Sequence, residues 1–150
     1  MMERRSKTAM LLALAAVAVT VSPAATQLSK PPRDPAGISR KLERSAELQR
    51  QVLETLANPG QAERIAANAW TQLKSAHDDM YVNNKYAQFP DPLYAGSDQR
   101  LTQALASLQI ALDTLRAHGQ WTDSAHEVER VRSNVQKALR LTNIVAQTSF

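Results

Sequence analysis

The placement of proline and glycine constrains the fold of this 150-residue chain more than any other feature. Proline removes a backbone hydrogen-bond donor and glycine disfavours helix interiors, so both residues mark breaks between helices. All of them lie between segments with regularly spaced apolar residues: Pro23, Pro31, Pro32, Pro35, Pro59, Pro90, Pro92, Gly37, Gly60, Gly96 and Gly119. They divide the chain after residue 34 into four segments, each long enough for a helix.

Apolar residues recur every three or four positions within each of these segments. The second segment shows the pattern with Ala62, Ile65, Ala66, Ala69, Leu73, Ala76 and Met80. This spacing places the apolar side chains on one side of a helix, whereas a strand alternates every second residue. It predicts four helices, at about 35–57, 59–83, 98–118 and 124–147. Four amphipathic helices bury their apolar faces in an all-α, antiparallel four-helix bundle, which we expect over residues 35–150.

Capping residues mark several of the expected helix ends. The starts carry Asp34 before Pro35, Asn58 before Pro59, and Ser124 in the S-x-x-E spacing of a capping box with Glu127. Gly119 predicts that the third helix ends in a left-handed turn. Short connections make the first and second helices, and the third and fourth, antiparallel pairs.

The connection between the second and third helices leaves the topology open. It covers about residues 84–96 and spans more than about 40 Å when extended at about 3.3 Å per residue. That reach exceeds the length of a bundle about 30 Å tall. Both an up-down-up-down arrangement and a crossover are therefore compatible with the sequence.

The N-terminal segment has the three parts of a secretory signal peptide. Positive charges at Arg4, Arg5 and Lys7 precede an apolar run over 9–21 and the small residues of 22–25. We predict a Sec-type signal peptide over residues 1–24, cleaved after Ala24, and an extended linker over residues 25–34. The alternative is an uncleaved anchor, although the apolar run is shorter than the roughly 18 residues of a membrane span. We therefore expect a periplasmic or secreted protein with no stable membrane span after cleavage.

Charge and cysteine content exclude several classes of function. The formal charge is +4, but Arg4, Arg5 and Lys7 against Glu3 account for half of it. The remaining excess is too small and too dispersed for a nucleic-acid-binding face. The chain has no cysteine, which excludes disulfides, thiol chemistry, cysteine-bound zinc and c-type haem.

Aromatic residues gather between the second and third predicted helices. Tyr81, Tyr86, Phe89 and Tyr94 are four of the seven aromatic residues in the chain, and they surround two prolines. Such a segment either packs onto the end of the bundle or forms a recognition surface. We predict these four side chains as a partner-binding surface, with packing onto the bundle as the alternative.

The histidines give weak evidence for a metal site. His77, Asp78 and Asp79 are consecutive, so their side chains point in directions about 100° apart and do not converge on one ion. His118 and His126 flank the last turn and are weak metal candidates, although helix capping accounts for both positions. No H-E-x-x-H motif, glycine-rich phosphate loop or G-x-S-x-G motif occurs, and we predict no cofactor and no catalytic residue.

The sequence thus predicts an exported, non-enzymatic module for protein interaction or assembly in the cell envelope, whose partner is another envelope protein. The alternative is a helical bundle that binds a small ligand or a metal.

Overall fold

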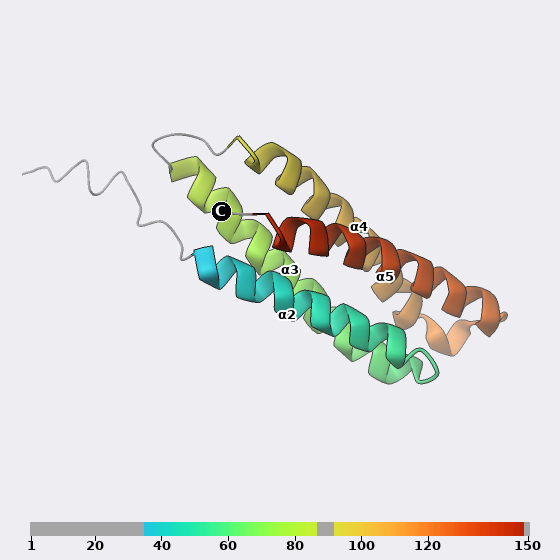
Figure 1. Ribbon diagram of the computed structural model, residues 1–150. Coiled ribbons are helices and arrows are strands. Elements are labelled where there is room, and N and C mark those ends of the chain that lie inside the picture. Colours follow the sequence, from blue (N-terminus) through green and yellow to red (C-terminus); the bar gives the residue numbers. More distant parts are fainter. Residues whose placement is uncertain (1–34, 87–91, 149–150) are drawn as a thin grey trace, which may run out of the picture.

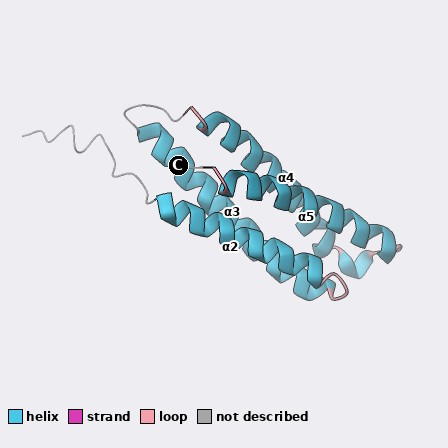
Figure 2. Ribbon diagram, viewed as in Figure 1, coloured by secondary structure: helices cyan, strands magenta, loops and turns pink. Residues whose placement is uncertain are grey.

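The computed structural model describes residues 35–86 and 92–148, which form four α-helices and one short 3-10 turn (Figure 1). The elements are α2 (Pro35–Glu54), α3 (Pro59–Tyr86), α4 (Tyr94–Arg116), η1 (His118–Gln120) and α5 (Ser124–Ala146). The described part of the chain contains helices and short connections but no strand (Figure 2). The predicted all-α four-helix bundle is therefore confirmed. The predicted signal peptide (1–24) and linker (25–34) lie outside the described residues.

The helices follow one another around the bundle in an up-down-up-down arrangement (Figure 1). Each helix packs against its neighbours in sequence, and α5 closes the ring by packing against α2. Only seven residues, 87–93, connect α3 to α4. They reach at most about 23 Å, whereas a helix as long as α4 extends about 34 Å. The crossover that the sequence left open is excluded by this short connection.

Three helix ends differ from the predicted positions by three residues or more. α2 ends at Glu54 rather than at 57, because Thr55 donates its backbone N–H to the Val52 carbonyl at 3.1 Å and starts a tight turn. α3 continues to Tyr86 instead of ending at 83. α4 begins four residues before the predicted 98, and its first turn is closed by the Ser97 N–H donating to the Leu93 carbonyl at 3.1 Å.

The prediction that the glycines lie between helices was wrong for three of them. Gly37, Gly60 and Gly96 lie in the first turns of α2, α3 and α4 rather than between helices. Pro35 and Pro59 occupy first helical positions, as predicted, where a missing N–H costs nothing because it has no partner in the helix.

The connection between α4 and α5 also corrects two predictions. Asp123, not Ser124, caps α5, because its side chain accepts the backbone N–H of His126 at 3.1 Å. Gly119 lies in η1 and does not adopt a left-handed conformation. The chain leaves α4 through Ala117, whose φ of −92° is ordinary for any residue, and a 3-10 turn then follows. A tight helical turn therefore replaces the predicted glycine exit.

The core follows a heptad pattern in which buried positions alternate three and four residues apart. On α3 these positions are Ala62, Ala66, Ala69, Leu73, Ala76 and Met80, and on α5 they are Val131, Val135, Ala138, Thr142 and Val145. This spacing is typical of helices that pack nearly parallel in a left-handed bundle. The opposite faces are polar, and none of the helices in residues 35–86 and 92–148 is long and apolar enough to cross a membrane.

Candidate functional site

Exposed tyrosines mark the end of the bundle where α3 ends and α4 begins. The side chains of Tyr81 and Tyr86, in the last two turns of α3, are 52% and 39% exposed. Leu93, immediately before α4, is 52% exposed at the same end. Single exposed apolar residues are ordinary on protein surfaces, but a group of them indicates an interaction site.

Lys85 joins the two tyrosines into one surface. Its ammonium nitrogen lies 5.9 Å from the ring centroid of Tyr81 and 5.5 Å from that of Tyr86. Contacts of this kind are worth about 0.5–1 kcal/mol at exposed sites. The positive charge also lies in the last turn of α3, where its interaction with the negative end of the helix dipole is favourable. We refer to Tyr81, Lys85 and Tyr86 as the tyrosine patch.

A hydrogen bond between His77 and Asp98 ties α3 to α4 next to the tyrosine patch. The His77 Nε2 atom lies 2.6 Å from Oδ1 of Asp98, and the Tyr94 hydroxyl donates to the same oxygen at 3.4 Å. Tyr81 lies one turn beyond His77 on α3, and Tyr94 lies one turn before Asp98 on α4. The His77–Asp98 pair therefore sets the spacing of the two helix ends that carry the tyrosines.

Burial distinguishes Tyr94 from the other two tyrosines. Tyr94 is half-buried and packs against the hydrophobic core. Burial raises the pKa of its phenol, and the negative charge and hydrogen bond of Asp98 and the neighbouring Tyr81 raise this pKa further. Of the four predicted partner-binding residues, Tyr94 thus packs onto the bundle, whereas Tyr81 and Tyr86 are exposed. Phe89 lies outside the described residues.

The acidic residues beside His77 each contact a different lysine. Asp78 binds Lys74 on its own helix at 2.6 Å, and Asp79 binds Lys41 of α2 at 2.6 Å. The three consecutive side chains therefore diverge, as their spacing predicted. Within residues 35–86 and 92–148, no three or more His, Asp or Glu side chains are grouped so that they could hold a metal ion.

His118 caps the end of α4. Its Nδ1 atom donates to the Leu115 carbonyl at 2.9 Å, because a carbonyl oxygen can only accept. Trp121 packs edge-on against the imidazole and donates from Nε1 to the Thr114 carbonyl at 2.9 Å. The Thr114 carbonyl also accepts the backbone N–H of Ala117 at 3.2 Å, so both side chains add hydrogen bonds to carbonyl groups in the last turn of α4. His126 is exposed in the first turn of α5, and no metal-binding group of the described residues includes either histidine.

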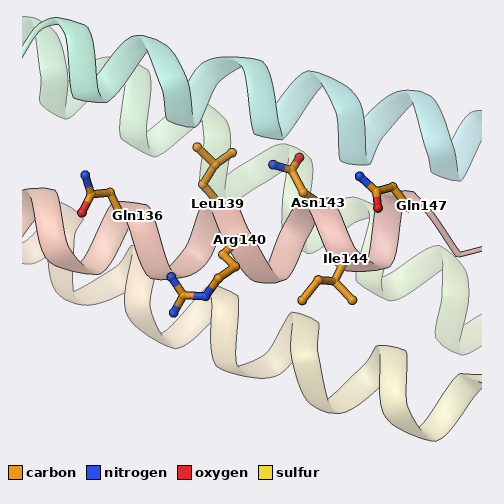
Figure 3. Close-up of a pocket in the computed structure, with 6 residues that line it drawn as sticks. All are labelled: Gln136, Leu139, Arg140, Asn143, Ile144 and Gln147. Atoms are coloured by element: carbon orange, nitrogen blue, oxygen red, sulfur yellow. The ribbon is translucent and has the colours of Figure 1, made fainter.

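A shallow hollow lies on the outer face of α5 (Figure 3). Leu139 and Asn143 point toward α2, and Arg140 and Ile144 point toward α4. The residues that line it lie on α5 or, for Gln147, at its C-cap: Gln136, Leu139, Arg140, Asn143, Ile144 and Gln147. A hollow on one helix does not enclose a ligand in the way that a binding pocket between elements does.

Two residues of this region were missed by the sequence analysis. Lys85 follows Tyr81 by four positions, and this spacing is a local signal for a contact on a helix. Asp98 has no such signal, because its contact with His77 depends on how α3 and α4 align. No protein-family model, curated protein or solved structure matches this chain.

Proposed function

We propose that this protein is an exported helical bundle that binds another protein of the cell envelope through its tyrosine patch and has no catalytic activity of its own. The observation that carries the proposal is the exposure of Tyr81 and Tyr86 on either side of the Lys85 ammonium group. Tyrosine contributes a large contact area with few rotatable bonds, and it is enriched in protein interfaces.

The position of the tyrosines supports binding to a protein. The patch lies on a continuous helix, and the nearby His77–Asp98 pair ties that helix to α4. Little conformational entropy is therefore lost when a partner covers the rings, and a pre-ordered surface binds more tightly than a flexible one. The Lys85 ammonium group adds one polar contact that can orient the partner.

Cross-linking in the native host tests this function. A tagged wild-type chain is compared with Tyr81→Ser/Tyr86→Ser, and Ile110→Ser is the matched control because Ile110 is also 40% exposed but lies on α4. We expect the double variant to lose a cross-linked partner by about 30-fold or more, as for substitutions costing at least about 2 kcal/mol at an interface. The control variant keeps the partner. Equal recovery by wild type and double variant, with unchanged circular dichroism, contradicts the proposal.

Export is tested separately, on the N-terminal residues. The positive, apolar and small-residue order of residues 4–25 supports secretion. Fractionation of the host followed by N-terminal sequencing should find the protein outside the cytoplasm, starting at Ala25. A cytoplasmic protein that retains Met1 contradicts this part of the proposal.

A further inference from the structure

A buried glutamine lies in the middle of the hydrophobic core. The side chain of Gln49 on α2 is fully buried, and its Nε2 atom donates to Ser45 Oγ at 3.0 Å and to Thr142 Oγ1 at 3.1 Å. The bond to Thr142 links α2 to α5. These two helices are neighbours in the bundle but are not consecutive in the chain. We refer to Ser45, Gln49 and Thr142 as the polar layer.

The hydrogen bonds determine which way the amide points. The Ser45 hydroxyl donates to the Ala69 carbonyl at 2.8 Å, and the Thr142 hydroxyl donates to the Ala138 carbonyl at 2.7 Å. Each hydroxyl has one hydrogen, so both can only accept from Gln49. A reversed amide would place its oxygen against two oxygens that have no hydrogen left to donate.

This orientation has a cost. The Gln49 Oε1 atom is buried and has no hydrogen-bond partner in the structure. An unpartnered buried acceptor destabilises a fold, and an apolar side chain of similar size avoids the penalty. Stability alone therefore does not account for a glutamine at this position.

The identity of the residues along α5 suggests what the polar layer does instead. Thr142 is the only buried residue of α5 with a polar side chain, because the others are Val131, Val135, Ala138 and Val145. A shift of α5 by one heptad would place Val135 opposite Gln49 and leave an amide hydrogen without an acceptor. The other buried residues of α5 are similar small aliphatic side chains, so their packing would change little if the helix moved by one heptad. They therefore specify the alignment of the helices only weakly.

We propose that the polar layer sets the register between the α2–α3 hairpin and the α4–α5 hairpin. The hydrogen bond from Ser45 to the Ala69 carbonyl extends the layer to α3. The layer therefore fixes the positions of α2, α3 and α5 relative to one another along the bundle axis. A single buried polar residue is known to select register in coiled coils at a cost in stability. In this bundle the selected register also brings Asp98 of α4 opposite His77 of α3.

The absence of cysteine makes the register directly measurable. Arg44→Cys on α2 and Lys137→Cys on α5 introduce two exposed spin-labelling sites into the full chain. They precede Gln49 and Thr142 by five residues on antiparallel helices, so they lie about 15 Å apart along the bundle axis. Double electron–electron resonance should give one narrow distance for the otherwise wild-type chain. In Gln49→Leu/Thr142→Val we expect a second population, because a one-heptad slip moves the helices by about 10 Å.

Two further variants complete the test. Ser107→Ala is the matched control, because it removes a buried hydroxyl from α4 outside the polar layer and should keep the single distance. Thr142→Val alone should lower the thermal midpoint, whereas the double variant should raise it by about 4 °C or more. One unchanged distance in Gln49→Leu/Thr142→Val overturns the proposal. A double variant that is less stable than Thr142→Val, or that does not fold, also overturns it, because the layer would then stabilise the fold instead of selecting its register.

Discussion

Replacement of Leu73 by alanine should be unusually costly for this bundle. Leu73 is the only leucine among the buried residues of α3, and it is fully buried. The core residues before and after it on the same helix are Ala69 and Ala76, also fully buried. An alanine side chain has no rotamer to change, so these neighbours cannot move into the space that the leucine leaves.

The expected loss follows from this rigidity. Leucine-to-alanine substitutions in protein cores cost about 2–5 kcal/mol, and the cost rises with the volume of the cavity that remains. Because collapse around residue 73 is restricted, we expect about 4 kcal/mol. Leu105, on α4, is half-buried and packs at the margin of the core. Its replacement should cost about 1 kcal/mol, since about 0.8 kcal/mol is lost for each fully buried methylene and Leu105 is only partly covered.

Urea unfolding followed by far-ultraviolet circular dichroism measures both losses on the same scale. Domains of this kind are stable by about 5–15 kcal/mol, so Leu73→Ala should still fold but with a much lower midpoint. The slope against urea should stay unchanged for both variants. A loss below about 2 kcal/mol for Leu73→Ala, or one equal to that of Leu105→Ala, would refute the claim that the alanine-rich core around α3 cannot relax.

Two other predictions concern helix capping and pH. Asp123→Ala should lower the free energy of unfolding by about 1 kcal/mol through loss of the cap of α5, while Ser124→Ala should change it little. Equal losses for the two variants in urea unfolding would contradict the assignment of Asp123 as the cap. Burial and Asp98 raise the pKa of Tyr94 in the folded state above the ordinary tyrosine value of 10.0, so above pH 10 the unfolded chain releases its proton first. Stability of the wild type should therefore fall as the pH rises from 10 through the folded-state pKa. Tyr94→Phe should remove the decrease in stability that Tyr94 causes above pH 10. An identical pH dependence of stability in the two proteins would exclude Tyr94 as the source of this decrease.

The helices were predictable because their signals are local. Apolar spacing identified the buried faces, and proline at residues 35 and 59 marked two helix starts that the structure confirms. The helix ends were less predictable, because competing caps differ by small free energies. Asp123 and Ser124 are adjacent and both suitable as caps, and the choice between them depends on the path of the chain through η1.

Contacts between helices were the part that local patterns did not reveal. The pairing of His77 with Asp98 requires the alignment of α3 with α4, which no spacing within one helix specifies. The burial of Gln49 was, by contrast, present in the sequence. The positions Ile38, Leu42, Ser45, Gln49, Val52 and Leu56 follow a strict alternation of four and three residues. This heptad spacing predicts that the glutamine lies in the core, whereas the spacing of the apolar residues alone does not include it.

The end of α3 connects the topology of the bundle with the proposed function. Met80 is the last buried residue of α3, yet the helix continues through Tyr86. This extension shortens the connection to α4 and so excludes the crossover. It also carries Tyr81 and Tyr86 beyond the last core layer of α3, where burial within the bundle gives no reason for large aromatic side chains. Contacts with Lys85 stabilise the extension but leave both rings exposed. Their apolar area would be removed from water by a partner at this end, which is the energetic basis for binding there.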